Sequence, residues 1–135
     1  PRGVGGAHRC LLWAVDVGRP IADGELTLSG KGLLVLAAGN RLLQLDPATG
    51  NETASAQLSG DHQGGMQVAG HRLLLVLHTL KQRGQPARDT LQARDIEDLS
   101  VLWEYEDAGT FTGAPSVDGG MVAVVGADGA AVLFR

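Results

Sequence analysis

The sequence predicts an all-β protein made of β-propeller blades: about three four-stranded antiparallel repeats that form part of a larger propeller. Three observations predict this fold. Short apolar runs alternate with glycine turns, one strand–turn–strand pattern recurs at intervals of 40 to 50 residues, and a compact Asp-Pro turn follows the first copy. The 20 glycines among 135 residues are about twice the average usage, and they punctuate the chain instead of gathering in one linker.

Composition excludes several classes of protein. Hydrophobic residues make up 44% and charged residues 19%, which is enough apolar material for a packed core. The net charge is −4 and no Lys/Arg run occurs, so we expect no nucleic-acid partner. No apolar run reaches the roughly 18 residues of a membrane span, so we expect no such span. The single cysteine, Cys10, allows no internal disulfide and is expected to be a small core residue.

The repeat centres on Gly30, Gly70 and Gly119, which lie 40 and 49 residues apart. Each glycine follows a short strand pattern and precedes a run rich in leucine, valine or methionine. The second interval is longer because a polar, Pro/Gly-containing insertion at 80–88 separates two of its strands, as in a long hairpin loop. Four short strands in a period of this length are typical of propeller blades.

Twelve strands and no helix are expected. Their ranges are 9–16, 25–28, 33–37, 41–46, 52–57, 65–68, 72–79, 90–95, 100–106, 113–117, 121–125 and 130–134. They divide the chain, taken as one domain over 1–135, into repeats at about 25–57, 65–106 and 113–134. The strand at 9–16 would be the outer strand of a neighbouring or velcro-closed blade. Three blades do not easily close a ring, and residues 1–6 resemble neither a signal peptide nor a native start, so we expect a fragment.

The turn Asp46-Pro47-Ala48-Thr49-Gly50 carries the most specific local chemistry in the chain. The Asp46 carboxylate can accept backbone N–H groups across the turn. Proline presets the backbone for the next position, and Gly50 can adopt the left-handed conformation that ends the turn.

The segment from Gly39 to Gly50 resembles the PQQ-like (quinoprotein-type) repeat. Blades of that family carry the phrase ALDxxTG and then a tryptophan eight residues after the aspartate. Here Asp46, Thr49 and Gly50 match the phrase, Trp103 follows Asp95 by eight residues, and Trp13 falls where the tryptophan of a preceding blade would lie. The chain departs from the pattern at Gly5, at Ala54, and at the turn Ile96-Glu97-Asp98-Leu99.

The resemblance implies that Trp13 and Trp103 are structural residues that dock neighbouring blades, which suits a large apolar ring with one N–H donor. Quinoprotein dehydrogenases of this superfamily bind PQQ together with calcium and an adjacent cysteine pair. This chain has no such pair and no recognisable set of calcium ligands, so we expect no cofactor, with PQQ as the remaining alternative.

No catalytic or metal site is expected from the remaining polar residues. The four histidines, His8, His62, His71 and His78, have no specific metal spacing, and the serines lack a nucleophile elbow. The acidic run 95–98 and the pair Glu104 and Glu106 fit a solvated turn and an exposed strand face. A calcium site at these acidic residues is the weaker alternative.

The insertion at 80–89 is the best candidate for a binding surface, since loops on a rigid scaffold often carry function. It holds Lys81, Arg83 and Arg88, although a tolerated surface insertion explains it as well. By resemblance to envelope assembly lipoproteins with PQQ-like repeats, we expect a non-enzymatic scaffold for protein partners in the cell envelope or periplasm. The alternatives are a ligand- or PQQ-sensing propeller on a signalling module, or a fragment of a quinoprotein dehydrogenase. The rest of a larger propeller, or self-association, would complete the blades.

Overall fold

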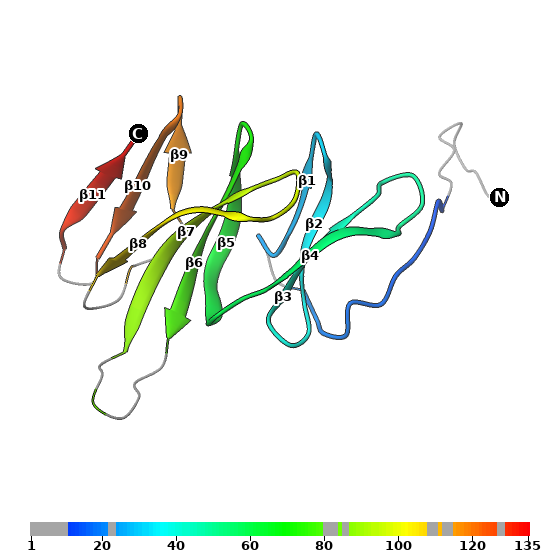
Figure 1. The fold of residues 1–135 in the computed structure, drawn as a ribbon, viewed down its shortest axis with the longest axis horizontal. Coiled ribbons are helices and arrows are strands. Elements are labelled where there is room, and N and C mark those ends of the chain that lie inside the picture. Colours follow the sequence, from blue (N-terminus) through cyan, green and yellow to red (C-terminus); the bar gives the residue numbers. More distant parts are fainter. Residues whose placement is uncertain are drawn as a thin grey trace, which may run out of the picture.

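The computed structural model describes residues 11–21, 24–79, 84, 87–107, 111, 115–126 and 129–135. Within these ranges the chain forms eleven strands and no helix, arranged as three antiparallel sheets that stand side by side (Figure 1). The all-β prediction is confirmed. No helix in these ranges has the length and the apolar character needed to cross a membrane.

Each sheet is a meander in which consecutive strands pair. The first sheet contains β1 (Leu26–Ser29), β2 (Gly32–Ala37), β3 (Arg41–Leu45) and β4 (Glu52–Gln57). The second contains β5 (Asp61–Ala69), β6 (Arg72–Thr79), β7 (Arg88–Asp95) and β8 (Val101–Asp107). The third contains β9 (Ser116–Asp118), β10 (Met121–Val125) and β11 (Ala131–Phe134). The first strands of the sheets are neighbours, since β1 contacts β5 and β5 contacts β9.

Strand alternation explains how the sheets stack. Successive side chains of a strand point to opposite faces, so an unbroken run of leucines supplies two interfaces at once. In β6, Leu73, Leu75 and Leu77 join the core between the first and second sheets. Leu74 and Val76 join the core between the second and third sheets.

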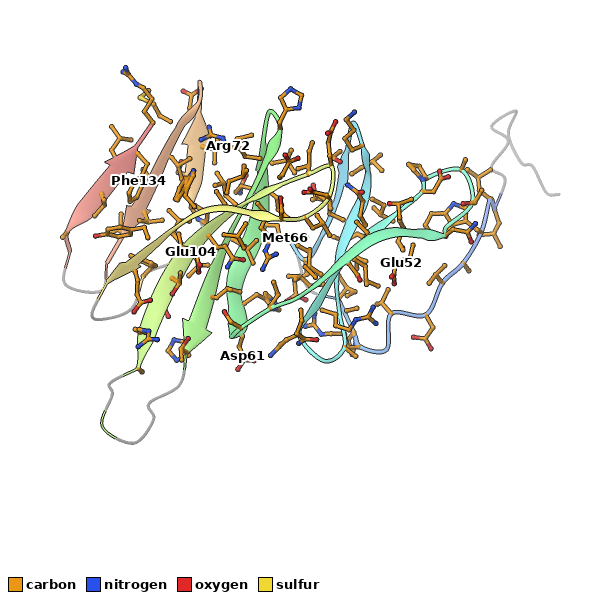
Figure 2. The ribbon with its side chains drawn as sticks, in the orientation of Figure 1. Glu52, Asp61, Met66, Arg72, Glu104 and Phe134 are labelled. Carbon is orange, nitrogen blue, oxygen red and sulfur yellow. The ribbon has the colours of Figure 1, made fainter. Side chains whose placement is uncertain are left out.

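The aromatic residues gather at the second of these interfaces. Phe134 of β11 lies 4.8 Å from Tyr105 and 5.5 Å from Trp103, measured between ring centroids, and Figure 2 shows it on the third sheet. The guanidinium of Arg72 donates to the carbonyl of Gly120 over 3.1 Å and also ties the second sheet to the third.

The strand registers show that the first two sheets repeat each other residue by residue. Gln44 pairs with Ala54 in the first sheet, and Ala93 pairs with Trp103 in the second. An irregularity follows directly after Gln44 and directly after Ala93. Ala54 therefore occupies the position that Trp103 occupies one sheet later.

The prediction of a strand at 9–16 is wrong for the part that the structure describes. Residues 11–17 belong to no strand; residues 9 and 10 lie outside the described ranges. The segment instead crosses the outer face of the first sheet, where Trp13, Val17 and Ile21 pack against the cluster of Val35, Ala37, Leu43 and Leu45. It is fastened by the Ala38 amide, which donates to the carbonyl of Val17 over 2.9 Å.

Candidate functional site

One end of the sheets, the loop-bearing end, carries the insertion between β6 and β7 and two further loops. The loop at 38–40 between β2 and β3, the connection at 58–60 between β4 and β5, and both ends of the insertion between β6 and β7 lie at the lower end in Figure 1. The two-residue turns at 30–31, 70–71 and 119–120 lie at the opposite end, together with the longer turns at 46–51 and 96–100. The two ends of the molecule therefore differ in the surface that they offer.

An open cleft of about 400 Å³ lies at the loop-bearing end. Its polar lining consists of Arg19, Asn40, Asp61 and His62, and its floor is the apolar stretch around Leu36. Figure 2 shows Asp61 at this end, where β5 begins. The Asn40 amide donates to Asp61 over 2.8 Å and joins the loops of the first and second sheets.

A buried carboxylate lies behind this cleft. Glu25 is 5% exposed, and its two oxygens contact Arg19 Nη2, at 3.0 Å, and His62 Nε2. Arg19 also donates to the carbonyl of Leu36 over 3.1 Å. A buried charge needs such partners, so these contacts hold the segment before β1, the covering segment at 11–21 and β5 together. Because each group has a partner within the protein, the cluster positions these three segments of the chain.

A second buried carboxylate ties the second sheet to the third. Asp89 is fully buried and accepts hydrogen bonds from His78 Nδ1 over 2.6 Å and from the backbone N–H of Phe111 over 2.6 Å. Phe111 in turn forms an isolated bridge with Gly126. His78 therefore has a hydrogen-bond partner within the protein.

The structure describes only part of the predicted binding loop at 80–89. Lys81 and Arg83 lie outside the described residues, so their prediction stays a prediction. Arg88 is the first residue of β7 and is half-buried, and its Nε lies 2.8 Å from Glu106 Oε1. One of the three basic residues is thus engaged in an ion pair within the second sheet.

The first copy of the repeat signature behaves as the turn chemistry predicts. The Asp46 carboxylate accepts the N–H of Ala48 over 2.9 Å, and the Gly50 N–H donates to the Asp46 carbonyl over 2.7 Å. The side chain of Thr49 accepts the N–H of Asn51 over 3.2 Å. Trp13 lies half-buried on this turn and donates its indole N–H to the carbonyl of Pro47 over 2.7 Å.

The second copy keeps the turn but changes its residues. Asp95 accepts the N–H of Glu97 over 2.8 Å in the same way, and Leu99 ends the turn with a positive φ of 65°. Arg94 donates to the carbonyl of Leu99 over 2.7 Å, and burial lowers the pKa of Arg94 below its ordinary value. Trp103 is half-buried beside Phe134.

Among the described residues, no group of three or more His, Cys, Asp and Glu side chains is placed to hold a metal ion. In the acidic run at 95–98, aspartate carboxylates form hydrogen bonds within the turn itself. Asp98 accepts hydrogen bonds from the hydroxyl and the N–H of Ser100 over 2.7 and 2.9 Å, which lowers the pKa of its carboxyl. These contacts are those of a turn.

Sequence reasoning missed the two buried carboxylates, Glu25 and Asp89. Glu25 directly precedes β1 and Asp89 is the second residue of β7, and such strand ends are also where solvated acids are found. Their partners, His62 and His78, lie 37 and 11 residues away in the sequence. Two histidines and two acids near strand ends were the only available signal, and it does not specify which pairs form.

Comparison with known proteins gives one family match and a weak structural likeness. No curated protein matches the sequence at a significant level. Among the solved structures, 35 chains match; one is BamB from Moraxella catarrhalis, with 19% identity and a TM-score of 0.36. That alignment covers 82% of this chain, and this chain spans 44% of that BamB chain. The family model described as "Outer membrane protein assembly factor BamB" matches residues 7–132. The chain therefore belongs to this family of proteins with PQQ-like repeats.

Proposed function

We propose that this chain is a non-catalytic propeller scaffold that binds a protein partner in the cell envelope. The family is described as an assembly factor for outer membrane proteins, and such a role requires contacts with other proteins at the membrane. The division into repeats at 25–57, 65–106 and 113–134 belongs to the same proposal.

The observation that carries the proposal is the cleft of about 400 Å³ at the loop-bearing end. The stacked sheets form a scaffold that places this cleft and the insertion between β6 and β7 at the same end. Binding surfaces are found preferentially on loops that a rigid scaffold positions. We therefore place the partner at the loop-bearing end, with Lys81 and Arg83 of the insertion as basic contacts.

Site-directed photocross-linking tests this placement. A photoreactive phenylalanine analogue replaces Ser59, an exposed residue at the loop-bearing end, and His71, an exposed turn residue at the opposite end, is the matched control. In cells that make the protein naturally, we expect a discrete adduct from position 59 that weakens in the K81A/R83A variant. Equal adducts from both positions, or an adduct from position 71 alone, would contradict the proposal.

A cofactor titration tests the alternatives in which the chain senses or uses PQQ. We expect no change in the melting temperature when PQQ is added up to high micromolar concentration, with or without calcium. A saturable rise in melting temperature, of the size that mass action gives for a ligand of the folded state, would favour a PQQ-binding domain instead.

A further inference from the structure

Where the covering segment at 11–21 meets the first sheet, Trp13 lies directly against Gly50. A β-carbon placed on Gly50 would lie 2.6 Å from two ring atoms of Trp13, far inside contact distance. Gly50 also has a φ of 77°, which disfavours side chains. The tryptophan can lie on this turn only because position 50 has no side chain.

At the junction of the first and second sheets, the turn 95–99 has the same backbone conformation as the turn 46–50, with Leu99 in the place of Gly50. The Leu99 N–H donates to the Asp95 carbonyl over 2.8 Å, as the Gly50 N–H does to the Asp46 carbonyl over 2.7 Å. The φ of 65° at Leu99 matches the 77° at Gly50. Leucine rarely adopts a positive φ, so we infer that the core around position 99 requires the leucine side chain.

The outer strand of the first sheet is changed in the opposite sense. Ala54 stands where the equivalent register position of the next sheet holds Trp103. It packs against the core between the first and second sheets, and that core contains Leu99, which is 1% exposed. A small residue on the outer strand therefore accompanies a large residue on the turn.

We propose that the pairs Trp13–Gly50 and Ala54–Leu99 are complementary exchanges, in which Leu99 fills the space that a tryptophan fills at the first junction. The two junctions then exclude each other's partners. An outer segment carrying tryptophan docks on the turn with glycine and would clash with the turn with leucine, whereas Ala54 would leave a cavity over a glycine. These two pairs thus determine which outer segment packs on which turn, and so fix the order of the sheets.

A double-mutant cycle tests the proposal. A54W and L99G each insert or remove volume at one junction, and we expect each to lower the urea midpoint of unfolding. Each single substitution should raise the equilibrium constant of unfolding. In the A54W/L99G protein, we expect this constant to rise at least tenfold less than the product of the two single rises. The reverse pair, W13A and G50L, should show the same coupling at the other junction.

Ala56 supplies the matched control, because it lies two residues along the same strand and packs against the same core. The A56W/L99G pair should be additive within twofold. Additive effects in the A54W/L99G cycle, or coupling of equal size at Ala56, would overturn the proposal. Failure of the A54W/L99G protein to fold would overturn it too, since that variant restores the arrangement seen at Trp13 and Gly50.

Discussion

Gly50 and Gly39 have almost the same backbone conformation, with φ of 77° and 78°, but different surroundings. A β-carbon on Gly39 meets nothing within 4 Å, whereas one on Gly50 meets the indole of Trp13. G39A and G50A therefore share the cost of a side chain in the left-handed region, about 1 kcal/mol. We expect G50A to destabilise by a further ~1–3 kcal/mol, the usual range for overpacking. Urea unfolding of the two variants measures the difference, and equal losses would mean that Trp13 does not lie on the turn.

Asp98 offers a pH-dependent test at the residue scale. The Ser100 hydroxyl, and then its N–H, lower the pKa of the Asp98 carboxyl by hydrogen bonding to the ionised form. Because the folded pKa lies below the unfolded one, these bonds stabilise the fold above the unfolded pKa, and their contribution is lost as pH falls through the folded pKa. We expect S100A to raise the pKa of Asp98, measured by NMR titration of its carboxyl carbon. An unchanged pKa would remove the Ser100 hydroxyl as the main cause.

Asp89 links elements, because its buried carboxylate accepts one hydrogen bond within the second sheet and one from the segment that leads to the third. In D89N one carboxylate oxygen becomes an NH₂ group, which cannot accept, so one of these two donors loses its partner. We expect a loss of ~1–3 kcal/mol in the free energy of unfolding, the cost of an unsatisfied buried polar group. The exposed D118N variant is the control and should change stability by less than about 0.5 kcal/mol. Equal effects of the two substitutions would show that Asp89 does not carry this connection.

The hairpins of this chain could be predicted from the sequence because each depends on neighbouring residues. The Asp46–Gly50 turn, the glycine turns at Gly30 and Gly70, and the apolar runs between them are local signals, and the strands formed there. Local signals do not determine whether the strand predicted at 9–16 forms. A strand needs a partner for its backbone, and the described part of that segment finds core side chains and single hydrogen bonds instead.

The candidate site was less predictable than the fold, for a physical reason. Glu25 meets Arg19 and His62 only once three separate segments have packed, and no local pattern encodes that meeting. The exchange at Ala54 and Leu99 did leave a trace, since both positions depart from the repeat pattern. The sequence could not show that the two departures compensate each other, because the contact arises only when the sheets stack.

At the scale of the whole molecule, the third sheet exposes a face that the first two sheets bury. Leu36, Val76 and Val125 are equivalent in register, and their exposed fractions are 2%, 1% and 41%. Leu133, on the same face as Val125, is 66% exposed. An apolar sheet face of this kind is what a further blade of a larger propeller would cover.

This difference predicts how polar substitutions act on the two kinds of face. V125S/L133S should change the free energy of unfolding by less than about 0.5 kcal/mol per residue, because both side chains are already largely hydrated. It should also lower the fluorescence of a dye that binds exposed apolar surface. L74S is the control in a buried face and should cost at least about 2 kcal/mol. A large loss of stability in V125S/L133S would mean that this face is covered within the chain.

Methyl–methyl NOEs from Leu34 test the stacking of the sheets most directly. Leu34 shares a core with Leu75, whereas Leu74, the neighbour of Leu75 in β6, faces the third sheet. With selectively labelled leucine and valine methyls, we expect Leu34 to show NOEs to Leu75 and none to Leu74, whose NOEs should run to Val122. NOEs from Leu34 to Leu74, or to both residues with equal strength, would contradict separate sheets stacked face to face.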